Sequence, residues 1–217
     1  MLTRNKHSQR ERGDTLIEVL FALTVFSFIV VSSLSIMNQG VSASQRSLEI
    51  TTVRQQMDGQ AEVLRFLHDS YVEAYQSGKG FNTADAASSP AEEYYKIIQF
   101  AKAGGRTAAS PFGGAGPCVV PSDIGKDFIL DPFTATLVTS VTTPNVFQKA
   151  TTYAQLTYTT SNVLKNSQGL WIEAITSPTT GASSGYTDFH IRGCWDAPGL
   201  NSPMNLGTIV RLYEPRA

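Results

Sequence analysis

The chain has few of the residues that build metal centres and active sites. Its 217 residues include two cysteines and three histidines, with no Cys-x-x-Cys pair and no Cys/His cluster at ligand spacing. Metal sites depend on such clusters, so the sequence predicts no metal site. It also lacks the Gly-Lys-Ser/Thr of a phosphate-binding loop and any Asn-x-Ser/Thr acceptor for N-glycosylation. We therefore expect no bound cofactor.

Charged residues are also scarce, at 16% of the chain, and the formal net charge is −1. Nucleic-acid binding by bulk electrostatics needs a dense positive surface, which this balance disfavours. The average conceals a basic head. Residues 1–13 have a net charge of +3, because Glu11 is the only acidic residue among them and four are basic. Residues 14–217 have a net charge of −4.

One long stretch, residues 15–37, has a single ionisable side chain, Glu18. As a helix rising about 1.5 Å per residue it spans roughly 35 Å, enough to cross a bilayer. Its hydroxyl residues, such as Ser27 and Ser32, can bond back to their own helix, so lipid tolerates them. Because the basic residues precede the stretch, the positive-inside rule places the N-terminus in the cytoplasm and the C-terminal part outside.

The residues that open this stretch form a recognisable processing motif. A short basic leader ends in Gly13, and Asp14-Thr-Leu-Ile-Glu18 leads into an uninterrupted apolar helix. This combination resembles the processing site of type IV prepilins and pseudopilins. The resemblance implies that residues 1–13 are a leader, which a prepilin peptidase removes after Gly13, and that Asp14 becomes an N-methylated terminus. It also implies that Glu18 directs assembly with other pilin subunits into a helical polymer.

Electrostatics gives Glu18 a physical reason to be there. A carboxylate in lipid costs about 2.5–3.5 kcal/mol on insertion scales unless a partner neutralises it. Cleavage after Gly13 would place an ammonium group on Asp14, so Glu18 of one subunit could neutralise the Asp14 amine of the next and set the axial register. The family usually has Phe where this chain has Asp14, whose carboxylate adds negative charge on the same helix face. The alternative is an interfacial Glu18 that snorkels or is protonated.

Two other interpretations of the N-terminus stay open. Ser33-Leu-Ser35 is a small-x-small site that a conventional signal peptidase could cut, with residues 19–31 as the apolar core. Glu18 just ahead of that core, and the helical pattern beyond the cut, argue against it. The other interpretation is an uncleaved signal-anchor, in which the leader stays attached.

The helical pattern continues beyond the apolar stretch. From Val41 to Ala74, apolar residues recur mostly at spacings of three and four, which is one face of a helix. No Pro interrupts it, and Ser77-Gly78 is a stop signal. We predict one helix, with a transmembrane and assembly part at 14–37 and an amphipathic continuation at 38–77. The alternative is a break near Gly40, where helix propensity falls.

Residues 78–127 are predicted to connect this helix to a sheet. Ser89-Pro-Ala-Glu92 is a capping box that begins a short helix at about 90–103, and a Gly-rich loop follows at 104–117. Over residues 128–217, short β-rich runs alternate with Gly, Pro, Asn and Ser. Their connections are too short for crossover helices, so we expect an antiparallel meander. The fold class is α+β, and a long helix packed on such a sheet looks like the pilin fold.

Cys118 and Cys194 are both placed outside the membrane by this topology, where disulfides persist. A bridge between them would close a loop of about 77 residues and add several kcal/mol of stability in the chain-entropy model. Two buried free thiols are the alternative that spacing leaves open. Many pilins carry one disulfide in this region, so the resemblance favours the bridge.

No residue is predicted to be catalytic, and we do not expect an enzyme. Gly181-Ala-Ser-Ser-Gly185 matches the G-x-S-x-G pattern, but it falls in a turn between strands rather than between a strand and a helix. Lys96, Lys102 and Arg106 could form a basic patch. The other basic residues outside the membrane are scattered along the chain, so nucleic acid is an unsupported partner.

The resemblance implies a structural subunit, of minor-pilin type, in an extracellular type IV pilus-like filament on the cell surface. Before assembly the chain would be a single-pass protein of the inner (cytoplasmic) membrane, with a cytoplasmic N-terminus and an extracytoplasmic C-terminal domain. One alternative is a pseudopilin of a type II secretion or DNA-uptake machine, which would share the processing site. Another is a membrane-anchored surface binding domain that does not polymerise.

Overall fold

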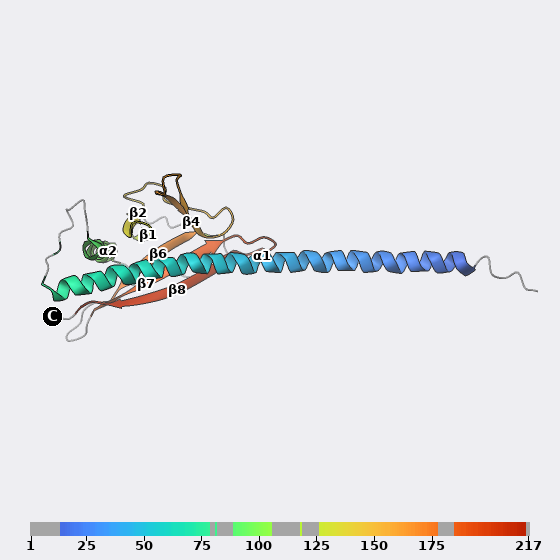
Figure 1. Ribbon diagram of the computed structural model, residues 1–217, viewed down its shortest axis with the longest axis horizontal. Helices are drawn as coiled ribbons and strands as arrows, with labels where there is room; N and C mark the ends of the chain where they lie inside the picture. The colour runs from blue at the N-terminus through green and yellow to red at the C-terminus, as the bar shows by residue number, and fades with distance from the viewer. Residues whose placement is uncertain are drawn as a thin grey trace, which may run out of the picture. The chain divides into compact units, whose positions relative to one another are not determined.

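The chain folds as an α+β protein in which a long N-terminal helix packs through its second half on a C-terminal antiparallel sheet (Figure 1). A computed structural model describes residues 14–78, 81, 89–105, 118, 126–177 and 185–215. Contacts between residues divide the chain after Gln45 into two units, residues 1–45 and 46–217. The second helix, the sheets and the hydrophobic core all belong to the second unit.

Helix α1, Asp14–Gln76, is continuous. It runs through Gly40 without interruption, so the alternative of a break there is wrong. The helix ends where the sequence predicts its stop. The Ser77 amide donates to the carbonyl of Glu73 at 3.1 Å, and Gly78 adopts a φ of +72°. Glycine reaches this left-handed conformation without the strain that a Cβ would bring.

The core-facing stripe of α1 begins later than the sequence pattern predicts. Val41 and Leu48 are 48% and 66% exposed, although their spacing placed them on the apolar face. The periodicity of an apolar stripe does not say where its covering surface begins, because burial depends on the partner element. From Val53 onward the stripe is buried, and its members are Val53, Met57, Ala61, Leu64 and Leu67.

Helix α2, Pro90–Gly104, begins at the predicted capping box. The Glu92 amide donates to the Ser89 hydroxyl at 3.4 Å, and the Ser89 amide donates to the Glu92 carboxylate at 2.9 Å. This reciprocal pair satisfies two donors that the first helical turn leaves without partners. Gly105, with a φ of +57°, closes the other end.

The larger sheet has five strands in the order β2-β1-β6-β7-β8, and every pairing in it is antiparallel. Its face toward the helices carries the largest buried side chains of the sheet, among them Phe128, Ile172 and Phe189. The strands are β1 Asp127–Asp131, β2 Thr136–Thr139, β6 Leu170–Thr176, β7 Tyr186–Trp195 and β8 Met204–Tyr213.

A second sheet departs from the expected single antiparallel meander. It has three strands in the order β3-β5-β4, and β3 runs parallel to β5. Strand β5 escaped sequence analysis because its residues are mostly polar. Asn166 and Ser167 are nevertheless buried, and Asn166 donates to the Gln148 side chain at 3.1 Å. The strands are β3 Phe147–Gln148, β4 Gln155–Tyr158 and β5 Leu164–Gln168.

Gly193 lets α1 approach β7 closely. A Cβ at this position would lie 2.9 Å from Cγ1 of Val53 and 3.7 Å from Sδ of Met57. A Val side chain is too short and branched to swing away, so any larger residue at position 193 would push the helix from the sheet.

We expect Gly193→Ala to lower the free energy of unfolding by about 2 kcal/mol, the usual cost of overpacking a core. Chemical denaturation followed by tryptophan fluorescence would measure it. The double variant Gly193→Ala/Val53→Ala should be non-additive, since Val53→Ala removes the atom that the new methyl meets. Strict additivity of the two losses would show that this contact does not limit the packing.

One buried polar side chain joins α1 to the sheet. Strand β1 pairs with β6 only through Asp127 and Phe128, so the backbone of Leu130 faces the gap where the two strands have separated. Gln60, which is fully buried, fills this gap. Its amide nitrogen donates to the Leu130 carbonyl at 2.8 Å, and its oxygen accepts from the Leu130 amide at 2.9 Å. The side chain thus makes the two bonds that a strand neighbour would have made.

Candidate assembly helix and disulfide region

The first half of α1 exposes an apolar surface. Every residue from Leu16 to Gly40 is exposed, and the large apolar side chains include Phe21 at 69% and Phe28 at 75%. Within the described ranges, α1 is the one helix long and apolar enough to cross a membrane. Soluble proteins rarely expose so much contiguous apolar surface. This indicates that lipid or another protein covers this part of α1.

Four hydroxyl side chains of this segment form hydrogen bonds within the helix. They donate to carbonyls three or four residues earlier, at 2.7–2.8 Å. These four hydroxyl groups therefore need no water to satisfy them, and burying them in an apolar environment costs little. The bonds confirm the prediction for Thr24, Ser27, Ser32 and Ser33.

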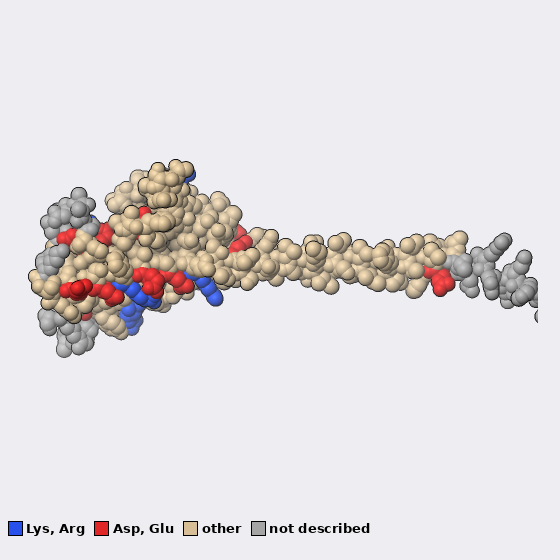
Figure 2. All heavy atoms as spheres, in the orientation of Figure 1, with Lys and Arg blue, Asp and Glu red and all other residues tan. Residues whose placement is uncertain are grey.

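Glu18 is the only charged residue between the start of the apolar surface and Arg46. Figure 2 shows the intervening surface of α1 without acidic or basic side chains. Glu18 is exposed and forms no ion pair among the described residues. Gly13 lies outside the described residues. Asp14 is the first residue of α1, and its side chain is not among those described.

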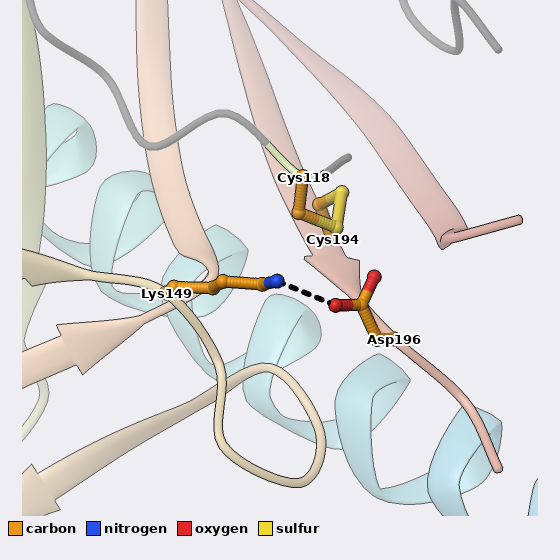
Figure 3. The surroundings of a disulfide bond; sticks show 4 residues. All are labelled: Cys118, Lys149, Cys194 and Asp196. Atoms are coloured by element: carbon orange, nitrogen blue, oxygen red, sulfur yellow. Dashed lines mark ion pairs between the residues drawn. A yellow bond between two sulfur atoms is a disulfide. The ribbon is translucent and has the colours of Figure 1, made fainter. Parts of the chain in front are cut away.

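Cys118 and Cys194 form a disulfide, with their Cα atoms 5.7 Å apart (Figure 3). The bond ties the segment before β1 to the end of β7, across 76 residues of sequence. A disulfide typically stabilises a protein by about 2–4 kcal/mol, mainly by constraining the unfolded chain. Lys149 and Asp196 pair nearby at 2.7 Å, but both are about half exposed, so this ion pair adds little.

The backbone around the disulfide is closely packed. Gly169 precedes β6 with a φ of +64°, and its carbonyl accepts from the Cys194 amide at 2.7 Å. A Cβ on Gly169 would lie 2.1 Å from the Cys194 carbonyl oxygen. Only glycine therefore fits at this position, both in conformation and in space.

Trp195 continues the disulfide region into the contact with α1. Its ring is fully buried, and its indole N–H donates to the Glu49 carboxylate at 3.0 Å. A buried tryptophan needs such a partner for its single donor. Sequence reasoning missed this pair because 146 residues separate its members and nothing in the local pattern connects them.

The face of the large sheet away from α1 carries buried charges. Glu173 and Arg192 lie 3.4 Å apart on neighbouring strands, with 2% and 4% of their side chains exposed. Trp171 donates to Glu173 at 3.2 Å. Burial lowers the pKa of the neighbouring His190, and the charge of Arg192 lowers it further. Removing either partner of the ion pair would leave a buried charge uncompensated, so the cluster supports the fold.

The basic patch, the G-x-S-x-G match and the Gly-rich loop lie only partly within the described residues. Lys96 pairs with Glu93 at 3.0 Å and Lys102 with Glu214 at 3.1 Å, whereas Arg106 lies outside the described residues. Residues 181–184 of the G-x-S-x-G match and residues 106–117 of the Gly-rich loop also lie outside them. Within the described ranges, no group of three or more His, Cys, Asp or Glu side chains could hold a metal ion.

Comparison with known proteins adds no relative. No family model, no curated protein and no solved structure matches the chain. The class of the protein is therefore defined by its own architecture. It is an α+β protein of pilin-like fold with an apolar N-terminal helix segment suited to anchoring in a membrane.

Proposed function

We propose that the protein is a structural subunit, of minor-pilin type, of an extracellular type IV pilus-like filament. One observation carries the proposal. Helix α1 exposes an apolar segment whose lone charge is Glu18, and the same helix packs through residues 53–67 on a disulfide-bonded antiparallel sheet domain. This combination supplies both a polymerising element and a stable domain for display outside the cell. A prepilin peptidase would remove residues 1–13 before assembly.

Lipid and filament offer the exposed half of α1 similar apolar surroundings. Lipid tails are as apolar as leucine side chains, so moving the segment from membrane to filament gains little hydrophobic free energy. A charge pair can make the filament more favourable than the membrane for this segment. In the membrane Glu18 bears an insertion cost of about 2.5–3.5 kcal/mol, which pairing with the Asp14 amine of a neighbouring subunit would offset. The pair also discriminates against wrong registers, because a shifted subunit leaves both charges without partners.

We expect Glu18→Ala to block assembly and leave membrane insertion intact. The fraction of the chain recovered in filaments sheared from cells should fall at least about tenfold, since the offset of 2.5–3.5 kcal/mol is lost. Glu62→Ala is the matched control. It removes an exposed carboxylate from the same helix, at a surface pair with Arg65 that is worth little.

The mature amino terminus, read by mass spectrometry of the purified protein, separates the candidate functions. A chain that begins at methylated Asp14 supports prepilin processing, whereas an intact Met1 contradicts it and favours a plain anchor. Normal recovery of Glu18→Ala in filaments would contradict the charge-pair mechanism even if processing occurs. A correctly processed chain that never reaches the cell surface would favour the pseudopilin alternative.

A further inference from the structure

The two edges of the large sheet differ in how their backbone groups are satisfied. Strand β2 forms one edge, and side chains close it. The Leu137 amide donates to Glu93 at 2.8 Å, and the Thr139 amide donates to the Thr142 hydroxyl at 3.0 Å. The Thr139 carbonyl accepts from the Thr143 amide at 2.9 Å. An edge with its groups occupied in this way resists pairing with another strand.

Strand β8 forms the other edge, and three bonds establish which of its residues face outward. The Glu214 amide donates to Gly185, which fixes the even-numbered residues of β8 as those bonded to β7. On the far side of β7, Cys194 donates to Gly169 and Tyr186 accepts from Ser177, as the same alternation requires. The outward residues are therefore Asn205, Gly207, Ile209, Arg211 and Tyr213.

This outward row is open over most of its length. The Tyr213 carbonyl is taken by the His68 ring at 2.9 Å. Among the described residues, no hydrogen bond occupies the backbone groups of Asn205, Gly207, Ile209 or Arg211. The ten-residue strand has an unbroken register with β7 and contains no Pro, no Lys and no bulge. Of the devices that usually protect an edge, β8 has one charged side chain, Arg211, and one contact from a helix, at Tyr213.

Exposed side chains accompany the open row. Ile209 is 59% exposed and Tyr213 is 54% exposed. Arg211 is held in place by two hydrogen bonds of 2.7 Å to the Asp188 carboxylate. Its Cζ atom lies 4.0 Å from the centre of the Tyr186 ring. Rigid aromatic and arginine side chains are the groups that most often anchor protein partners, because little entropy is lost when they are covered.

We propose that the free edge of β8 is a docking site for an extended segment of another polypeptide, which joins the sheet as a further strand. Only a polypeptide backbone offers N–H and C=O groups at the spacing of the outward row. Arg211 is the sole charged residue of β8 and is already paired with Asp188, so the edge favours a segment that has few charges and places an apolar side chain against Ile209. This inference does not depend on the proposed function.

A second copy of the chain fits this edge less well than a different polypeptide. Head-to-tail pairing would need the β2 edge, which Glu93 and Thr142 occupy. Antiparallel pairing of β8 with β8 is the remaining way in which two copies could join through this edge, and the test below detects it directly. We therefore commit to a foreign strand and treat self-pairing as an outcome that overturns the proposal.

The test uses the full chain in detergent micelles and a synthetic probe peptide of about ten residues, a length typical of a long strand. The probe alternates Val and Thr with one Asp and is blocked at both ends. Its control is the same peptide with N-methyl groups on alternate residues. At millimolar probe, amide hydrogen exchange at Gly207, Ile209 and Arg211 should slow about tenfold or more, while the control peptide has no effect.

Two variants separate backbone pairing from side-chain contact. Ile209→Pro removes one outward N–H without touching the ladder to β7, so it should abolish the protection. Ile209→Ala keeps that N–H, so the probe should still protect the β8 amides in this variant. Gly207→Pro repeats the test at a second outward residue if Ile209→Pro disturbs the fold, which exchange at the Phe189 amide would reveal.

Four results would overturn the proposal. The first two are that the probe protects a proline variant that keeps its fold as well as it protects the wild type, and that millimolar probe slows exchange at none of the three amides. The other two are that the probe slows exchange at the Leu137 and Thr139 amides of β2 as much as at β8, and that the free chain forms dimers that pair through β8.

Discussion

Gln60→Leu is expected to lower the free energy of unfolding by about 4 kcal/mol, although it places an apolar side chain of similar size in the core. The wild-type amide makes two bonds to the Leu130 backbone. Leucine leaves that N–H and C=O buried without partners, at about 2 kcal/mol for each group. An average backbone hydrogen bond contributes less than this, so the cost arises from the two groups left behind.

The emission of tryptophan during chemical denaturation would follow this loss, since Trp195 is fully buried in the wild type. Gln55→Leu is the matched control, because Gln55 is an exposed glutamine on the same helix. We expect that change to alter stability by less than about 0.5 kcal/mol. If the two variants unfold at the same denaturant concentration, the Gln60 bonds do not hold β1 to the helix.

Gly169→Ala is expected to be at least as damaging, with a loss of about 4 kcal/mol. Two causes add. An alanine in the left-handed region costs about 1–2 kcal/mol in backbone strain. Its Cβ would also meet the Cys194 carbonyl oxygen at 2.1 Å, so the strand or the turn must move, and overpacking of this kind costs a further 1–3 kcal/mol. The displaced atoms belong to the backbone of the disulfide-bonded residue.

Gly78→Ala separates the two causes. Gly78 has a similar φ of +72°, yet a Cβ there would meet nothing within 4 Å. This control should lose only the strain of about 1–2 kcal/mol. Thermal or chemical unfolding of both variants would give the difference. Equal losses would show that the turn before β6 moves freely and that the contact with Cys194 does not restrain it.

The sequence alone located the helices well because their signals are local. Side chains three and four residues apart share a helix face, so the run from Asp14 and the stop at Ser77-Gly78 could be predicted without any partner surface. The capping box at Ser89 is equally local, since it bonds residues three apart. For the candidate site, the apolar segment and its lone Glu18 were also visible in the sequence.

The sheets were predicted less completely because strand pairing is a long-range property. Strand β5 carries no apolar alternation, and its buried polar side chains find partners on β3 and β4 that are distant in sequence. Which edge of a sheet is closed cannot be derived from propensity at all. Glu93 closes β2 from a helix that lies 44 residues earlier. Among the residues that the structure describes, no comparable side chain bonds to the backbone in the middle of β8.

By itself the sequence determined the apolar helix with its single acid, the helix boundaries and the α+β class, because charge, hydropathy and capping act over a few residues. Only the tertiary structure decided that Gln60 would serve as a strand neighbour, that Gly169 and Gly193 would admit no Cβ, and that no described side chain would close the middle of β8. Each of these depends on backbone atoms brought together from distant parts of the chain, and the free energy at stake appears only when such atoms are packed and withdrawn from water.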